Sequence, residues 1–427
     1  MNDKILKRLK FLEIFLFFLI FIEVIHVCYS LFFNMEKDLY FDGVNAIDKN
    51  SNYYVTVGSN NSNVNHYEKA KVSAYDSKRN KKFEKLYNVG YNSAFFGVAF
   101  DDDDIIAVGN YEKTADEHSN LQRRALIVKY NMSGEIIFQK DFQILDNSKF
   151  TNIYIVDDGY LVTGQSVYQN TKIGNKKGGA VLLKYDKDGN ILWSKTYGDN
   201  KFGCFNDLLV SEGFIYTVGI NKGNSVICKF DMEGNLCGYD DYNSGTDFGF
   251  NSIVVLNDKL YVSSSKRNGS RNFAVIVMYD FDCNYINEVL FNSKNDTCYN
   301  RLMIDSHGYI VAIGTVSVKG DFSNKMMDGF HYGGIIGKYK ANLEKISVVT
   351  YEYNQNDLFT DIINNNGEYL VVGHSLYNDV YLSKFIRYSE ALKVLDVESW
   401  FAKKKNVIFT FLFVIKLNNK WFIYISV

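Results

Sequence analysis

The most metal-like segment of the chain is an acidic turn. Asp186 and Asp188 precede Gly189 and Asn190, and oxygen ligands at alternate positions are what a calcium loop needs. Such a loop also needs a distal acidic ligand, and no glutamate stands at the twelfth position. Related turns elsewhere carry Ser or Glu instead. This pattern predicts a tight hairpin turn and no metal site.

Other residues with catalytic chemistry are scattered. The acid run 101–104 is typical of a solvated turn, and none of the six histidines shares a motif with another. His374 is interpreted as an ordinary loop residue. The sequence has no nucleophile elbow, phosphate loop or zinc motif. It therefore predicts no catalytic motif, no metal and no cofactor.

Two carboxylates keep an enzymatic alternative open. Asp207 and Asp361 occupy the same place in two copies of a repeated strand, where both would face a central channel. Paired acids are the usual means of general acid and base catalysis. The alternative function is therefore an extracytoplasmic hydrolase or lyase with channel-facing carboxylates.

The elements that would position these residues are repeats. Three markers recur every 45 to 60 residues: an aromatic followed three places later by an apolar residue, a glycine, and a second aromatic. The first marker stands at Phe41/Val44, Phe95/Val98, Phe150/Ile153, Phe205/Leu208, Phe250/Ile253, Tyr299/Leu302 and Phe359/Ile362. The glycine stands at Gly58, Gly109, Gly164, Gly219, Gly314 and Gly373, with Ser264 in the fifth copy. Each copy offers four short apolar strands, a to d.

Seven such copies predict an all-β fold over residues 40–400, a seven-bladed β-propeller of four-stranded antiparallel blades. A sheet that is apolar on both faces needs a neighbour on each side, and a closed ring supplies both. The repeat, with G-Y-L-V-T-G and a later V-L-L-K-Y-D-K-D-G-N-I-L-W, resembles the bacterial seven-bladed β-propeller repeat of the SBBP type. The resemblance covers about residues 40–400 and is best in 150–198. It is also loosely similar to quinoprotein-like blades. The resemblance implies a fold and an extracytoplasmic setting but no reaction.

The long loops between strands b and c, which lie on one face of a propeller, provide the candidate ligand-binding residues. These loops mix aromatic and charged side chains, which suits recognition. The residues predicted to bind a ligand are His118, Arg123, Arg124, Tyr168, Asp328, Phe330, His331 and Tyr332.

The N-terminal segment predicts a membrane anchor. Residues 1–10 form a basic tail, and residues 11–33 are dominated by Leu, Ile, Phe and Val. The positive-inside tendency places the tail in the cytoplasm and the rest of the chain outside. A retained transmembrane helix is favoured; a cleaved signal sequence and a lipid-modified Cys28 are the alternatives.

The C-terminal tail has no counterpart in the repeat. Residues 401–427 contain two apolar runs around Asn418 and Asn419, which favours a hairpin over a second membrane span. Within the repeats, Cys228 and Cys237 are equally distant from the turn at 232–233. They are predicted to lie opposite each other as two free thiols in contact, since a bridge across so short a loop would add little stability.

The amino-acid composition narrows the range of possible partners. The net charge of −2 gives no reason to expect nucleic acid. Proline is absent and Asn, Lys, Ile, Tyr and Phe are abundant, as in proteins of an AT-rich bacterium. The leading hypothesis is a single-pass protein of the cell membrane whose propeller, outside the cytoplasm, acts as a binding or scaffold module for protein or glycan.

Overall fold

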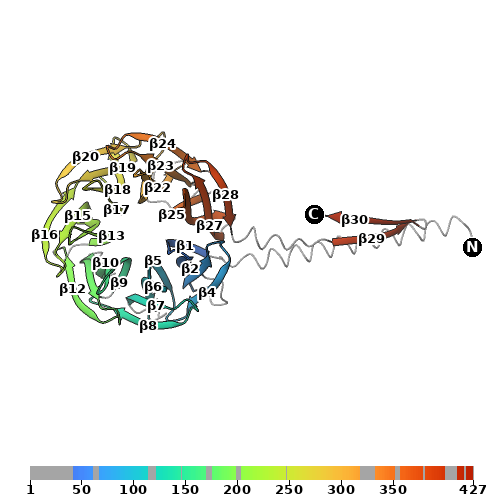
Figure 1. Ribbon diagram of the computed structural model, residues 1–427, viewed down its shortest axis with the longest axis horizontal. Helices are drawn as coiled ribbons and strands as arrows, with labels where there is room; N and C mark the ends of the chain where they lie inside the picture. The colour runs from blue at the N-terminus through green and yellow to red at the C-terminus, as the bar shows by residue number, and fades with distance from the viewer. Residues whose placement is uncertain are drawn as a thin grey trace, which may run out of the picture.

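The computed structural model describes residues 42–60, 67–113, 122–145, 147–169, 176–198, 203–246, 248–317, 332–351, 356–377, 380–399, 411–417 and 420–426. In this part of the chain the secondary structure is β throughout. Strands β1 to β28 follow one another around a ring, as Figure 1 shows. The predicted membrane segment 11–33 lies outside the described residues.

Each run of four consecutive strands forms an antiparallel four-stranded unit. The first two units comprise β1 (Asp42–Lys49), β2 (Tyr53–Asn60), β3 (Lys69–Asp76), β4 (Lys81–Tyr87), β5 (Ser93–Asp101), β6 (Asp104–Glu112), β7 (Arg123–Tyr130) and β8 (Ile136–Phe142). The next two comprise β9 (Asn147–Val156), β10 (Gly159–Gln169), β11 (Lys176–Tyr185), β12 (Ile191–Tyr197), β13 (Gly203–Ser211), β14 (Phe214–Asn221), β15 (Asn224–Phe230) and β16 (Leu236–Tyr242).

The remaining units follow the same plan. They comprise β17 (Ser252–Leu256), β18 (Lys259–Asn268), β19 (Arg271–Tyr279), β20 (Tyr285–Leu290), β21 (Thr297–Ile304), β22 (Ile310–Ser317), β23 (Tyr332–Tyr339), β24 (Lys345–Tyr351), β25 (Asn356–Asn365), β26 (Glu368–Tyr377), β27 (Val380–Ser389) and β28 (Val394–Ser399). In the tail, β29 (Phe411–Leu417) pairs antiparallel with β30 (Lys420–Ser426).

The expected all-β propeller with four-stranded antiparallel blades is confirmed, but the expected separation into seven sheets is not. Among the described residues the ring contains five hydrogen-bonded sheets, three with four strands and two with eight. The eight-stranded sheets arise because one parallel residue pair joins two neighbouring units: Arg123 with Asn147 in one sheet, and Tyr332 with Asn356 in the other.

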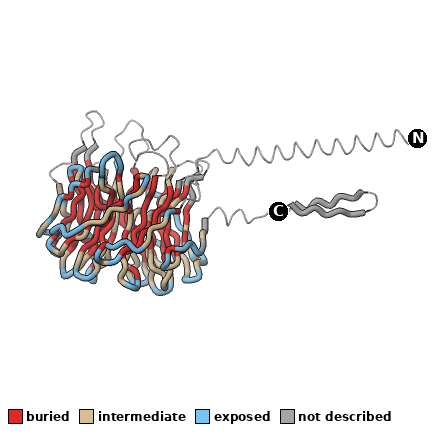
Figure 2. The backbone as a smooth tube through the Cα atoms, turned by 90° about the horizontal axis from the view of Figure 1, so that it is seen from above, coloured by how far each residue is buried: buried red, intermediate tan, exposed pale blue. Residues whose placement is uncertain are grey.

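Burial follows the position of a strand within its unit. The first strand of each unit lies nearest the centre of the ring and the fourth lies on the outside (Figure 1). Second strands such as β14 are buried along almost their whole length, whereas fourth strands such as β8 are mostly exposed. Figure 2 shows the buried residues inside the body of the ring. Apolar side chains of neighbouring units pack against each other there, and this packing is the core.

A bulge in the first strand explains the glycine marker. In the unit β13–β16 the pairing shifts between Phe205 and Asp207, and Gly219 opposes Phe205. A Cβ atom at Gly219 would lie 1.9 Å from the carbonyl oxygen of Cys204, which no side chain tolerates. The glycines of the other copies face a first-strand carbonyl at 1.8 to 2.0 Å in the same way.

The fifth copy replaces this glycine because its first strand is shorter. Strand β17 begins at Ser252 and pairs only as far as Ser263, so Ser264 faces no bulge. The Ser264 hydroxyl instead donates a hydrogen bond of 2.7 Å to the Gly249 carbonyl.

In the first copy the residue at the position of the aromatic marker is not an aromatic. Gly58 pairs with Val44, and the pairing then shifts between Val44 and Ala46. Val44 and Ile47 therefore stand where Phe95 and Val98 stand in the next copy. The predicted pair Phe41/Val44 was wrong by three residues, because a buried valine takes the place of the aromatic.

The hairpins between third and fourth strands share one turn. In Asp186–Asn190 the Asp186 carboxylate accepts the N–H groups of Asp188 (3.0 Å) and Asn190 (2.7 Å), and Gly189 has φ 79°. The acidic segment is thus a turn, as predicted. The residue with positive φ is Arg79, Gly134, Gly189, Gly234, Cys283, Leu343 and Leu392 in successive units.

Side-chain volume across the unit boundary accounts for three of these exceptions to glycine, Cys283, Leu343 and Leu392. A Cβ at Gly234 would lie 2.8 Å from Trp193 of the preceding unit, so the indole fills that space. Gly238 occupies the same fourth-strand position as Trp193, because Gly238 pairs with Lys229 and Trp193 pairs with Lys184. In the unit that follows Gly238, the turn residue equivalent to Gly234 is Cys283. A large fourth-strand residue therefore meets glycine, and a small one meets a buried Cys or Leu.

Candidate functional site

The centre of the ring is held by hydrogen bonds between neighbouring units. The residue that follows the buried aromatic in the first strand is usually Asn or Thr, and its side chain donates to the backbone carbonyl of the equivalent aromatic in the next unit. These bonds are Asn45 to Phe95 (2.8 Å), Thr151 to Phe205 (2.5 Å), Asn206 to Phe250 (2.9 Å), Asn251 to Tyr299 (3.0 Å), Asn300 to Phe359 (3.0 Å) and Thr360 to Val44 (2.8 Å). The last of them closes the ring between the final and the first unit.

The two carboxylates of the enzymatic hypothesis converge on one arginine. Arg301, on β21, places Nη1 2.9 Å from Asp207 Oδ2 and Nε 3.0 Å from Asp361 Oδ1. The three residues occupy equivalent first-strand positions, each following the bulge. Both acids are predicted from the sequence to face the channel, but Arg301 is not among the predicted residues. Its position two residues after Tyr299 in the repeat is the signal that could have found it.

Backbone donors complete the environment of both acids. Asp207 accepts N–H groups from Leu208 (2.9 Å) and Ile253 (3.0 Å). Asp361 accepts N–H groups from Ile362 (2.9 Å) and, across the ring closure, Ile47 (2.9 Å). The backbone donors and the arginine hold both carboxylates in position. The arrangement joins units of the ring and does not resemble an acid and base pair awaiting substrate.

Electrostatics in this cluster follow from burial. Burial raises the pKa of Asp361, and the charge of Arg301 acts against that rise. Burial would lower the pKa of Arg301, but the charges of Asp207 and Asp361 outweigh it and raise the pKa. Burial also raises the pKa of Asp48 to about 6, although the carboxylate accepts the Phe100 N–H at 2.9 Å. The charge of Asp361 adds to the rise at Asp48.

The predicted ligand-binding residues that are described lie where second strands end or third strands begin. Arg123 and Arg124 open β7, Tyr332 opens β23, and the backbone of Tyr168 lies in β10 opposite Lys177. These strand ends belong to the face that carries the loops between second and third strands. His118, Asp328, Phe330 and His331 lie outside the described residues.

Arg123 is held by a buried carboxylate on this loop face. Its Nε donates to Glu112 Oε1 at 2.9 Å and its Nη2 lies 2.8 Å from the same oxygen. The Glu112 side chain is 5% exposed, whereas that of Arg123 is 51% exposed. Asn92 donates to the other Glu112 oxygen at 2.8 Å and accepts the Glu68 N–H at 3.1 Å.

Arg124 belongs to a separate pair. Its guanidinium forms an ion pair with Asp141, and the Tyr111 hydroxyl donates to the same carboxylate at 3.1 Å. Because these partners are partly exposed, the pair adds little to stability. It nevertheless fixes a cation and a phenol beside Arg123, and the face therefore presents two oriented guanidinium groups.

Two further expectations need correction. His374 is not a loop residue, because it lies inside β26 opposite Leu358, and burial lowers its pKa to about 4. Cys228 and Cys237 are both free thiols as predicted, but they do not face each other. The register shifts between Lys229 and Phe230, so Cys228 pairs with Tyr239. Cys228 is buried and Cys237 is exposed.

In the parts of the chain that the structure describes, no group of three or more His, Cys, Asp or Glu residues is placed to hold a metal ion. No helix there has the length and hydropathy needed to cross a membrane.

Comparison with known proteins yields likeness of fold alone. The sequence matches no protein family model and no curated protein. Solved propellers resemble the structure: Sqt1 from Chaetomium thermophilum (12% identity, 79% of this chain and 95% of that chain, TM-score 0.45) and the WD40 β-propeller domain of Doa1 (9% identity, 81% and 93%, TM-score 0.46). The Dos1 propeller is similar at 12% identity, with 77% and 75% covered and a TM-score of 0.45.

Proposed function

We propose that this chain is a binding or scaffold module of the cell envelope, a seven-bladed β-propeller that engages protein or glycan through its loop face. Each four-stranded antiparallel unit is counted as one blade, which gives seven. In each of the two larger sheets, a single parallel residue pair joins two such units. The resemblance of residues 40–400 to the SBBP-type repeat, best in 150–198, supports the same count.

The proposal includes a membrane anchor at residues 11–33 and a propeller outside the cytoplasm. Its support is the apolar run preceded by the basic residues Lys4, Lys7, Arg8 and Lys10. An anchor of this kind would hold the propeller near the membrane surface and limit the distance over which it finds partners.

One observation carries the binding role: the orientation of Arg123 by the buried Glu112. A half-exposed guanidinium whose position is set by a buried carboxylate loses little freedom on binding. Arginine is also enriched among residues that dominate protein interfaces. The acids at the centre of the ring, in contrast, are already engaged by Arg301 and by backbone donors.

Site-specific photo-crosslinking in intact cells tests this role. A photoreactive amino acid at Tyr111, beside Arg124, should yield adducts with an envelope component, and the same group at the exposed Asp188 of the opposite face should not. Arg123→Ala should weaken the Tyr111 adducts. Adducts from Asp188 in the absence of adducts from Tyr111 would contradict the proposed face.

Protease digestion of intact cells tests the proposed membrane topology. Protease added to intact cells should digest the propeller and spare the first ten residues. Protection of the whole chain would contradict the proposed location outside the cytoplasm.

A further inference from the structure

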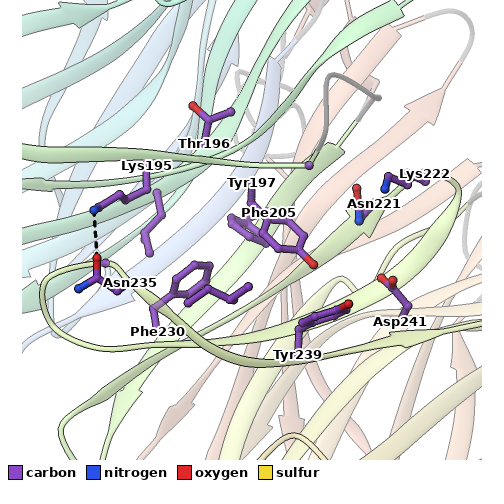
Figure 3. Close-up of a pocket in the computed structure, with 14 residues that line it drawn as sticks. Lys195, Thr196, Tyr197, Phe205, Asn221, Lys222, Phe230, Asn235, Tyr239 and Asp241 are labelled. Carbon is purple, nitrogen blue, oxygen red and sulfur yellow. Dashed lines mark hydrogen bonds between the residues drawn. The ribbon is translucent and has the colours of Figure 1, made fainter.

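A groove lies between the unit β9–β12 and the unit β13–β16, and none of the residues predicted to bind a ligand lines it. Its volume is about 580 Å³, within the range of small-molecule sites. One wall comes from β12 and the other from β16, and the side chains that line it are drawn in Figure 3.

Aromatic rings form the middle of the groove. Tyr197 from β12 and Tyr239 from β16 meet edge to face with their centroids 6.3 Å apart. Phe205 stacks on Tyr197 at 5.7 Å and lies 6.0 Å from Phe230, which closes the floor. Tyr239 is 55% exposed, so a ligand can reach its ring.

Polar groups of both signs stand at the two ends. Lys195 donates to Asn235 Oδ1 at 3.2 Å at one end. Asn221, Lys222 and Asp241 gather at the other end (Figure 3). Burial and the charge of Asp240 raise the pKa of Asp241, whereas Lys222 and a hydrogen bond from Asn221 act against the rise.

The exposed carboxylate of Asp241 is held in place at the polar end of the groove. Asn221 beside it is 6% exposed, and its side chain forms a hydrogen bond with Asp241. Asp241 therefore presents a positioned acceptor beside the exposed Tyr239 ring, where a ligand can meet both.

From these features we infer that the groove binds a neutral saccharide of one or two sugar residues. Sugar hydroxyls both donate and accept, so they can donate to Asp241 and accept from Lys222 or Lys195. The C–H face of a sugar ring can pack on the exposed Tyr239 ring. A ligand with a full charge fits less well, because the charges of Lys222 and Asp241 have opposite signs and oppose each other's attraction. The groove borders the loop face at the turn between β14 and β15, where Lys222 lies. Its lining includes none of Glu112, Arg123 and Arg124, on which the proposed function rests, so the two can be tested separately.

The test is binding of the purified full chain to an array of neutral oligosaccharides built from glucose, galactose, mannose and N-acetylglucosamine. The detergent must have no sugar headgroup, which would compete. The strongest array member is then titrated against Tyr239→Ala, Asn221→Ala and the control Tyr285→Ala, an exposed tyrosine on β20 that does not line the groove. We expect each groove variant to weaken binding by about tenfold or more and the control to stay within about twofold.

Other outcomes overturn the inference. Failure of the whole array to bind overturns it, and binding of a peptide library that Tyr239→Ala abolishes would identify a peptide groove instead. Saccharide binding that Arg123→Ala weakens and Tyr239→Ala leaves intact would move the site to the loop face and leave the proposed function standing. If Asn221→Ala does not fold, Tyr239→Ala decides the outcome, because its exposed side chain contributes little to the core.

Discussion

Replacing Arg301 with glutamine should destabilise the ring at its centre. The substitution removes the cation that lies 2.9 Å from Asp207 and 3.0 Å from Asp361 and leaves the two buried carboxylates without a counter-charge. Removal of one partner from a buried ion pair costs about 3–5 kcal/mol. Because the Arg301 side chain is 30% exposed, we expect the lower end of that range, about 3 kcal/mol at pH 8.

The destabilisation should depend on pH in a defined direction. Burial already raises the pKa of Asp361, and Arg301→Gln removes the charge that opposes this rise. The folded variant then binds a proton more tightly than the unfolded chain, whose Asp pKa is about 3.9. The carboxyl is neutral in both states below about pH 4 and costs least there. The loss of stability should therefore grow as pH rises from about 4 through the folded pKa.

Urea unfolding of the full chain at pH 5 and pH 8, followed by tryptophan fluorescence, measures this effect. Asp361→Asn in the Arg301→Gln background should recover part of the lost stability at pH 8. The matched control is Lys340→Gln, which removes an exposed pair with Glu344 and should cost about 0.5 kcal/mol or less. A loss below about 1 kcal/mol for Arg301→Gln, or an equal loss at both pH values, would refute the reasoning.

Three further predictions concern other parts of the ring. Gly314→Ala should cost at least about 3 kcal/mol in urea unfolding, because the added Cβ would lie 1.8 Å from a carbonyl oxygen, whereas Ser264→Ala should cost about 1 kcal/mol for one lost hydrogen bond. Iodoacetamide should modify Cys237 in the folded protein and Cys228 only after unfolding, as mass spectrometry would show. Asp48→Asn should stabilise the protein more at pH 8 than at pH 4, and the difference should reach about 2 kcal/mol. The reason is that the Asp48 pKa of about 6 makes the buried carboxylate of the unaltered chain increasingly costly as pH rises through that value.

A specific result would contradict each of these three predictions. Equal costs for Gly314→Ala and Ser264→Ala would show that the bulge does not explain the glycine marker. Equal labelling of both thiols would contradict the shifted register. A stability difference between Asp48→Asn and the unaltered chain that does not change between pH 4 and pH 8 would place the Asp48 pKa near its ordinary value.

The repeated strands could be predicted from the residues alone because their signals are local. An apolar run bounded by Asn, Asp and Gly is the same pattern wherever it stands, and the Asp186 carboxylate that shapes the acidic turn accepts hydrogen bonds from Asp188 and Asn190, within five residues. The class of fold followed because each sheet is apolar on both faces. Glycine in the second strand was equally visible, since the bulge of the first strand permits no Cβ there.

The exceptions depend on neighbours that are distant in the chain. Leu392 replaces the turn glycine because the fourth strand of the preceding unit leaves room for a buried side chain, and Val44 replaces an aromatic at the closure of the ring. A one-residue shift of register separates Cys228 from Cys237, although their spacing in the sequence is symmetrical.

The central cluster of Asp207, Arg301 and Asp361 could likewise be predicted only in part from the sequence. Asp207 and Asp361 could be placed on equivalent strands from the repeat, but Arg301 lies 94 and 60 residues away from them along the chain, by subtraction of their numbers. Only the closed ring brings its guanidinium within 3.0 Å of both carboxylates. Local patterning determines which segments become strands. Packing between units determines which charges, cavities and side-chain volumes meet, because those contacts join residues that share no local sequence signal.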